Sequence, residues 1–511
     1  MSRSPFQFAG IAAWLAATLV AVHGSAAHAE DASPVRLVVK EVPLKVLGRE
    51  VTVIAIEQAD GTQGYAPERA AGFDVEVVNQ LKVPTAIHWH GLILPNLMDG
   101  VPFVTQEPIQ PGASFRYRFP LRQSGTYWMH SHYGLQEQFL TSAPLIIWSP
   151  EERAKAEHQH VVMLTDFSFT APAEILERAR RGMPTSMPSS MKMPEAPPIE
   201  MVAQKWDEQA GRLTRAVVRG PAPDIDVAYD ALLANRRTID DPEVVRVKPG
   251  ETVLLRLIAA SSATNFVIDT GALDAEVVAV DGKGVRPLKG DFFQLAVAQR
   301  IDLRVRIPAE GGVFPILAQG EGTQLLCGVI LSTREGAEAV PVAARTAAMP
   351  AAALDLSQER RLQATAPLAE RTVDRTLPAV LGGNMKTYVW TINNQAYPNR
   401  DALTVRRGER VEMTLTNTTR MGHPMHLHGH DFQIVGIDGQ RVSGALRDTV
   451  HVPPGATVAI AFDADNPGLW AFHCHLIYHL ASGMFTVVKY DDADLRFWQP
   501  DGTREEVLGL R

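Results

Sequence analysis

Twelve residues near the C-terminal end of the chain combine the side chains His473, Cys474, His475, His479 and Met484. Neighbouring side chains on a β-strand point to opposite faces. Cys474 would therefore face one way and His473 and His475 the other, so a single strand could serve two metal sites. A cysteine, two histidines and a weak axial methionine form the ligand set of a blue-copper centre. This stretch provides that set except for one histidine.

Three further clusters of closely spaced histidines occur in the chain, and they consist of His88 and His90, of His130 and His132, and of His423, His426 and His428. The last cluster offers the missing histidine of the blue-copper set. A single pair with one intervening residue says little, because such pairs also occur as ordinary core or surface residues. Four clusters, one of which contains a cysteine, indicate a site for several metal ions.

Short β-branched segments separated by Gly, Pro, Asn and Asp turns must position these histidines. Their spacing predicts antiparallel β-sandwiches or barrels. The predicted strands are 35–40, 51–57, 73–79, 114–120, 244–247, 252–258, 275–280, 301–307, 386–392, 402–405, 410–417 and 457–462. Each pair of histidines two residues apart would then share one strand face.

The length of 511 residues predicts about three domains. We expect a secretory signal peptide at 1–29 and β-domains at 30–150, 151–335 and 382–511, with a connector rich in Ala, Pro, Arg and Glu at 336–381. The middle domain has histidines only at its edge and is expected to act as a spacer without copper. The net charge of −8 gives no basic face for nucleic acid.

The N-terminus has the features of a cleavable export signal. Arg3 is followed by an apolar run and then by a small-residue cleavage site at Ala27 to Ala29. No later segment is apolar and long enough to cross a bilayer. Of the two cysteines, Cys327 lies in an apolar strand and is predicted to be a buried spectator, whereas Cys474 between two histidines is better explained as a metal ligand.

The order of the four clusters resembles the copper motifs of the three-domain multicopper oxidases, the laccase-like family. These motifs read HWHG, HSH, HPMHLH and HCHLIYH with Met484 behind them. The segments 98–102, 124–128, 134–138 and 475–479 are most similar to the bacterial copper-resistance protein A branch. The resemblance implies an all-β fold of three cupredoxin-type Greek-key β-sandwich domains.

The resemblance also implies four copper ions: one type 1, one type 2 and two type 3. Cys474, His423 and His479 would bind the type 1 copper, with Met484 as axial ligand. His88 and His426 would bind the type 2 copper. The two type 3 coppers would be bound by His90, His130, His132, His428, His473 and His475. The eight histidines outside the type 1 site divide evenly between the first and last domains, so only an interface between those domains could gather them.

The family implies that a reducing substrate gives electrons one at a time to the type 1 copper. The electrons would then pass through Cys474 to His473 and His475, and O2 would be reduced to water at the other three coppers. This reduction consumes protons. Asp99, nine residues after His90, is predicted to donate them, although Asp99-Gly100 is also a common turn pair. Where several relatives carry a second acid, this chain has Leu480.

The positions of several methionines favour Cu(I) as the substrate. Met421 precedes His423 by two residues, at a position that helps to bind Cu(I) in cuprous oxidases, although Thr419 replaces their acid. Four methionines between Met183 and Met193 add soft ligands for Cu(I), or are merely part of a Met-rich surface loop. We expect a periplasmic, monomeric oxidase of Cu(I). The alternatives are a laccase acting on phenols or aromatic amines and a non-catalytic copper-binding or electron-transfer protein.

Overall fold

The computed structural model describes residues 33–155, 157–182, 197–335, 346–399 and 401–497. The predicted signal peptide at 1–29 and the Met-rich segment 183–193 lie outside these residues. Within the described ranges, no helix has both the length and the apolar character that a membrane span requires.

The first stretch forms two sheets, whose strand pairs are antiparallel except for β1 with β3. One has the order β2-β1-β3-β5 and consists of β1 (Val35–Val46), β2 (Arg49–Glu57), β3 (Phe73–Asn79) and β5 (Ser114–Phe119). The other has the order β4-β6-β7 and consists of β4 (Ile87–His90), β6 (Gly125–Ser131) and β7 (Ser142–Ile147). Residues alternate between buried and partly exposed along β3, so that strand has one core-facing side. All residues of β4 and β6 are buried, so both faces of these strands are covered.

The middle stretch begins with the short helix α1 (Pro150–Lys155). An eight-stranded sheet follows the order β11-β8-β13-β18-β15-β16-β10-β9. Its strands are β8 (His158–Phe167), β9 (Ile199–Asp207), β10 (Arg212–Gly220), β11 (Ala231–Ala234), β13 (Thr252–Ala259), β15 (Ala275–Val280), β16 (Lys283–Gly290) and β18 (Arg300–Arg306). Helix α2 (Pro172–Arg180) follows β8.

A five-stranded sheet completes the middle stretch in the order β12-β20-β19-β14-β17. It consists of β12 (Glu243–Arg246), β14 (Phe266–Asp269), β17 (Phe292–Leu295), β19 (Val313–Gly320) and β20 (Leu326–Ser332). Cys327 on β20 is a free, buried thiol, as the sequence predicted.

The last stretch also forms two sheets. The larger has the order β22-β21-β24-β30-β26-β27, with β28 paired to β26. Its strands are β21 (Arg375–Asn384), β22 (Val389–Ile392), β24 (Arg410–Asn417), β26 (Phe432–Ile437), β27 (Gln440–Arg441), β28 (Leu446–Arg447) and β30 (Thr457–Asp463). Strand β21 lies partly inside the predicted connector 336–381, because its Ala379 and Leu381 pack into the core.

The smaller sheet of the last stretch positions the motif at 473–484. Its order is β23-β32-β31-β25-β29, and its strands are β23 (Leu403–Val405), β25 (His423–Leu427), β29 (Thr449–Val452), β31 (Leu469–Cys474) and β32 (Phe485–Tyr490). β31 ends at Cys474, and the short helix α3 (Ile477–Ala481) follows and carries His479. β25 and β31 pair with Met425 opposite Cys474 and with His426 opposite His473.

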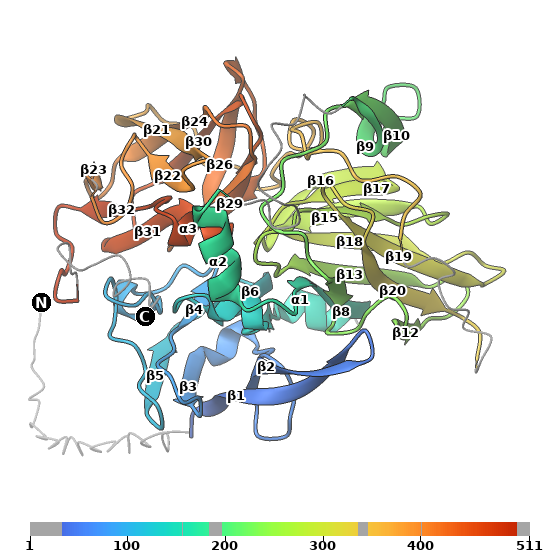
Figure 1. The fold of residues 1–511 in the computed structure, drawn as a ribbon, viewed down its shortest axis with the longest axis horizontal. Coiled ribbons are helices and arrows are strands. Elements are labelled where there is room, and N and C mark those ends of the chain that lie inside the picture. Colours follow the sequence, from blue (N-terminus) through green and yellow to red (C-terminus); the bar gives the residue numbers. More distant parts are fainter. Residues whose placement is uncertain (1–32, 156, 183–196, 336–345, 400, 498–511) are drawn as a thin grey trace, which may run out of the picture. The chain divides into compact units, whose positions relative to one another are not determined.

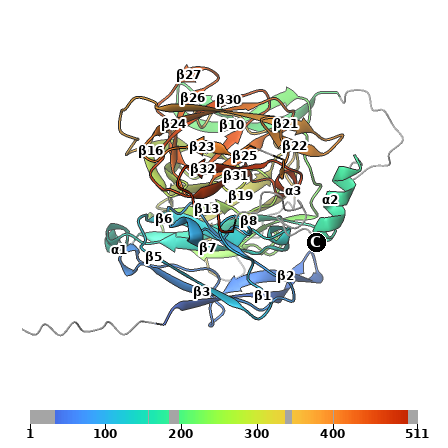
Figure 2. The same cartoon turned by 90° about the vertical axis from the view of Figure 1, so that its left-hand side faces the viewer.

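The described chain is therefore all-β, as predicted. Figure 1 shows the three stretches as blue to cyan, green to yellow and orange to red groups of strands. One buried hydrophobic cluster joins the first and last stretches and includes Trp89, Trp128 and Trp470, whereas a second belongs almost wholly to the middle stretch. In Figure 2 the strands β6 and β7 lie between β1 and β3 on one side and β25 and β31 on the other. The sheet β4-β6-β7 thus brings the first two histidine clusters next to the last two.

Candidate metal centres

Cys474, His423 and His479 converge at one buried point. The Cys474 Sγ lies 3.7 Å from the Nδ1 of each histidine, and the two Nδ1 atoms lie 3.1 Å apart. The Nε2 atoms face away: that of His423 lies 2.8 Å from Thr419 Oγ1, and that of His479 lies 2.9 Å from Asp226 Oδ2. The outer nitrogen of His423 is therefore hydrogen-bonded, and that of His479 faces the Asp226 carboxylate without a hydrogen bond. The inner Nδ1 atoms, which lie close to Cys474 Sγ, are the ones that could bind a metal.

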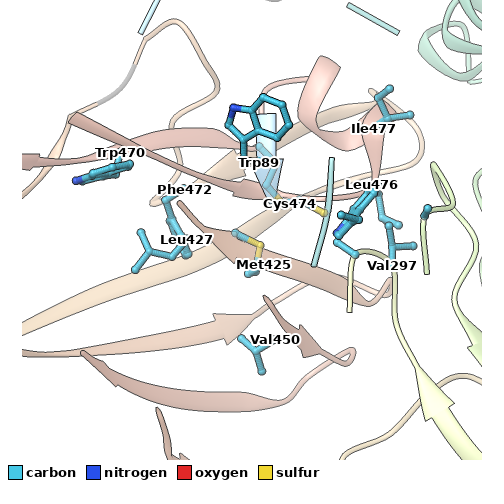
Figure 3. Close-up of a cluster of buried hydrophobic side chains, with 14 of the residues drawn as sticks. Trp89, Val297, Met425, Leu427, Val450, Trp470, Phe472, Cys474, Leu476 and Ile477 are labelled. Atoms are coloured by element: carbon cyan, nitrogen blue, oxygen red, sulfur yellow. The ribbon is translucent and has the colours of Figure 1, made fainter. Parts of the chain in front are cut away.

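Met484 is buried beside this group, and its backbone closes the loop around it. The Met484 carbonyl accepts a hydrogen bond from the Cys474 N–H, and its N–H donates to the His479 carbonyl. Met425, the cross-strand neighbour of Cys474, is completely buried in the apolar core. Figure 3 shows Cys474 and Met425 among Leu427, Phe472 and other apolar side chains.

The eight remaining histidines gather into adjoining groups whose ligand atoms lie within 4.8 Å of one another. The groups are His88 with His90 and His426, His90 with His130 and His475, and His132 with His428 and His473. Two of the rings, His90 and His426, stack at 3.8 Å between centroids. The structure thus brings together all eight histidines that the sequence assigned to a shared cluster, half from each end of the chain.

Oxygen acceptors around this cluster fix the orientation of most imidazoles. Five histidines place Nδ1 within 3.2 Å of an oxygen outside the cluster, which turns Nε2 inward: His88 to the Asp99 carbonyl, His130 to Glu137, His426 to the Asp448 carbonyl, His428 to the Asp99 carboxylate and His473 to the Cys474 carbonyl. His90 is reversed, since its Nε2 lies 3.0 Å from Asp448 Oδ1. Such outer partners select the tautomer of a metal-binding histidine.

The inward nitrogens fit a metal. Among the described residues, five inward atoms are buried without a hydrogen-bond partner: His88 Nε2, His90 Nδ1, His130 Nε2, His426 Nε2 and His475 Nε2. Burial, reinforced by the neighbouring imidazoles, holds the pKa of His90, His130, His426 and His475 well below the usual value. Neutral imidazoles with free lone pairs are the form that binds copper.

The donor set of the cysteine group also fits copper. Burial raises the pKa of the Cys474 thiol, so a metal cation must displace the proton to form the thiolate. One thiolate and two imidazoles in an apolar pocket are the donors of a blue-copper site.

Acidic side chains also contact both groups, and two of these contacts were not predicted from the sequence. Glu137 lies 3.1 Å from His130 and 3.9 Å from His475, in a small pocket that Leu480 also lines. Asp226 contacts His479 from the middle stretch, which therefore does more than act as a spacer. A single acid carries no spacing pattern, so only the folded chain reveals these contacts.

Asp99 is completely buried and lies 2.9 Å from His428, which places it beside the cluster.

A cavity of about 710 Å³ adjoins the cysteine group. Asp224, Asp226, Met385, Trp390 and Met421 are among its lining residues. The Trp390 ring stacks on His479 with 3.9 Å between centroids. The wall of the cavity therefore touches a residue of the cysteine group directly.

An all-β fold with a buried cysteine–dihistidine group, joined through one strand to an all-histidine cluster, defines a copper redox protein. Three models of the multicopper oxidase family match residues 54–152, 204–330 and 372–494. The chain belongs to this family. It is a copper-dependent oxidoreductase with O2 as the electron acceptor, as predicted.

Individual relatives agree with this assignment. The chain is 34% identical to the multicopper oxidase MmcO of Mycobacterium tuberculosis, over 81% of this chain and 79% of that protein. It is 27% identical to copper resistance protein A of Escherichia coli, over 82% and 86% of the two chains. The solved structure of Fet3p, a multicopper oxidase that functions in iron import, shares the fold with a TM-score of 0.71 at 22% identity, over 92% of this chain and 93% of that one.

Proposed function

We propose that this protein is a periplasmic, monomeric cuprous oxidase that protects against copper, with the export signal and domain boundaries given above. Four copper ions would be held as the resemblance implies: one by Cys474, His423, His479 and Met484, one by His88 and His426, and two by His90, His130, His132, His428, His473 and His475. Bound copper would take single electrons from the substrate and supply the four-electron reduction of O2 to water.

The side chains that line the cavity beside His479 support Cu(I) as the substrate. Met385 and Met421 offer thioethers, and Asp224 and Asp226 offer carboxylates. Thioethers are soft ligands that favour Cu(I), and the acids add negative charge that attracts a cation. Gly182 also lines this cavity, and the Met-rich segment follows it directly in the sequence. The substrate Cu(I) would bind here, close to the outer edge of His479.

The residues around the two centres have separable roles. Thr419 hydrogen-bonds the outer nitrogen of His423 and so orients that ring, and the Asp226 carboxylate lies 2.9 Å from the outer nitrogen of His479. The backbone from His473 to His475 is the direct covalent connection between the two centres. Asp99 would hold and release the proton that O2 reduction consumes at its Oδ1 atom, because Oδ2 accepts from His428 Nδ1 at 2.9 Å.

Steady-state O2 consumption tests the substrate. We expect copper-loaded protein to consume O2 with Cu(I), and Met421→Leu to raise the KM for Cu(I). Met413→Leu is the matched control, because Met413 is a completely buried core methionine outside the cavity lining. Deletion of residues 183–193 should also weaken Cu(I) turnover. Turnover of dimethoxyphenol alone, unaffected by these changes, would contradict the cuprous-oxidase proposal.

A laccase activity is the second candidate function. It is favoured by Trp390, whose indole ring lines the same cavity. A cavity of about 710 Å³ accommodates a phenol, and Asp226 could accept its hydroxyl proton. Under this alternative Trp390→Leu raises the KM for dimethoxyphenol and Met421→Leu does not. If neither reductant supports O2 uptake by protein with its full copper content, the non-catalytic copper-binding alternative is the one left.

A further inference from the structure

A buried ion pair from the middle and last stretches lies directly behind His90. Both NH groups of the Arg300 guanidinium donate to the Asp448 carboxylate, at 2.8 Å to Oδ1 and 2.5 Å to Oδ2. Asp448 Oδ1 also lies 3.0 Å from His90 Nε2. All three side chains are at most 1% exposed. The three strands or turns that meet at this point therefore come from the three different stretches of the chain.

The rest of the guanidinium is fixed as well. Arg300 Nε donates to the Thr126 carbonyl on β6, and NH1 donates to the Ala298 carbonyl. Burial alone would lower the pKa of Arg300, but Asp448 and Asp281 raise it, so the group stays charged. A bidentate Arg–carboxylate pair is a rigid unit. Asp448 therefore cannot turn away from His90 without losing bonds to Arg300.

Asp448 contacts two stacked imidazoles in opposite ways. Its carboxylate accepts from His90 at Nε2, which leaves Nδ1 of His90 inward and without a partner. Its backbone carbonyl accepts from His426 at Nδ1, 2.8 Å away, which leaves Nε2 inward. A carboxylate and a carbonyl can only accept, so each fixes one tautomer.

We propose that Arg300 and Asp448 are positioning residues that select the Nε2–H tautomer of His90 and so direct its Nδ1 lone pair at the copper cluster. The middle stretch thereby contributes to copper binding without supplying a ligand. This inference rests on the assignment of His90 as a copper ligand in the proposed function.

The glycine that follows His90 supports the importance of this pair. Gly91 has φ +85°, and a Cβ there would lie 2.5 Å from both Arg300 NH2 and Asp448 Oδ2. The ion pair thus occupies the space that any other residue would need, and the turn after β4 passes directly over it.

Substitution Asp448→Asn tests the proposal without changing the shape of the side chain. The amide disrupts the bond that selects the tautomer only if its nitrogen faces His90. The decisive variant is therefore Asp448→Ala combined with Thr449→Val, because Thr449 Oγ1 also lies 3.1 Å from His90 Nε2. In protein without copper, labelled with 15N at histidine, we expect the His90 proton on Nε2 in the parent chain and on Nδ1 in the variant. The His90 signal is assigned by its loss in His90→Gln. An unchanged tautomer in Asp448→Ala with Thr449→Val, where neither side chain can accept from His90 Nε2, would overturn the proposal.

Copper loading gives a second readout. Outer partners of metal ligands typically change metal affinity by about 10–100-fold, and we expect a loss of that size at the histidine cluster in Asp448→Asn and in Arg300→Lys. Copper content and the paramagnetic resonance spectrum of the cluster report this loss. The blue absorption of the Cys474 centre should persist in these variants. A failure of the proposed function would look different, because the parent protein itself would then never bind more than one copper.

The pair Arg256 and Asp302 provides a matched control. It is equally buried, joins strands β13 and β18 of the same sheet at 3.0 Å, and also contacts Thr126. No histidine of the cluster is among its hydrogen-bond partners in the described chain. Arg256→Lys and Asp302→Asn should lower stability without changing the cluster spectrum. An equal loss of copper in these controls, or full copper with an unchanged spectrum in Arg300→Lys, would show that the pair behind His90 is merely structural.

Discussion

Cys474 is the residue of the cysteine group that is bonded directly to residues of the histidine cluster. Its side chain points at His423 and His479, while its backbone neighbours His473 and His475 belong to the histidine cluster. The alternation of side chains along β31 accounts for His473 and Cys474, because neighbouring strand residues point to opposite faces, whereas His475 lies just beyond the end of the strand. The outer oxygens that orient the rings could not be predicted in this way.

Replacement of Cys474 by serine should abolish the blue absorption, because a hydroxyl does not replace the thiolate ligand. The histidine cluster should keep its copper, since it uses no atom of that thiol. Visible absorption and copper content measure both effects. Cys327→Ser is the control: this buried thiol belongs to no metal group in the described chain. It should lose about 1–3 kcal/mol of stability through burial of a hydroxyl and stay blue.

Glu321 gives a prediction about pH. Burial raises its pKa from 4.5 to about 7, while the Nδ2 group of Asn265 donates to its carboxylate. The native state therefore holds a proton that the unfolded chain releases above pH 4.5. Because the folded pKa is the higher one, this contribution to stability is complete below pH 4.5 and is lost as pH rises through about 7.

Denaturant unfolding between these two pH values checks this prediction. The parent protein should lose stability relative to Glu321→Gln as pH rises, since the glutamine cannot ionise. Parallel pH profiles for the two proteins would contradict the assignment of a raised pKa to Glu321.

At the scale of elements, strands with a clear sequence pattern were predicted more successfully than strands without one. The alternation in β3 and the β-branched runs in β13 and β15 place these strands within a residue or two of the predicted ranges. Strand β21 was missed because Pro378 and several small residues weaken its pattern, and its burial depends on pairing with β24, which is distant in sequence. Local propensity cannot supply that tertiary contribution.

The turn after β4 yields a prediction with an internal control. Gly91→Ala places a Cβ against Arg300 and Asp448, and it also strains a left-handed backbone. Gly61 has nearly the same φ, +86°, with no atom within 4 Å of a Cβ. Gly61→Ala should therefore cost only the strain, about 1–2 kcal/mol. Gly91→Ala should cost more and should also lower copper content, as measured by thermal unfolding and metal analysis. Equal destabilisation by the two changes would argue against the collision.

At the scale of the molecule, the sequence identified the proposed copper ligands but not the part played by the middle stretch. The ligands cluster in motifs, whereas Asp226 and Arg300 act alone and meet their partners only through folding. The histidine cluster is also an interface: His88, His90, His130 and His132 come from the first stretch, and His426, His428, His473 and His475 from the last. Any metal bound there joins the two ends of the chain.

Removal of copper should therefore weaken the association of the first and last stretches. A ligand that binds only the native state stabilises it by about 4 kcal/mol when its free concentration is a thousand times its Kd. Thermal unfolding should thus occur at lower temperature in chelator-treated protein than in loaded protein. Loaded Cys474→Ser protein should keep most of the gain, because the cluster that bridges the two stretches remains filled. Identical unfolding temperatures for loaded and copper-free parent protein would contradict a bridging role for the cluster. If the loaded Cys474→Ser protein unfolded like copper-free parent protein, the stabilisation would belong to the cysteine centre instead.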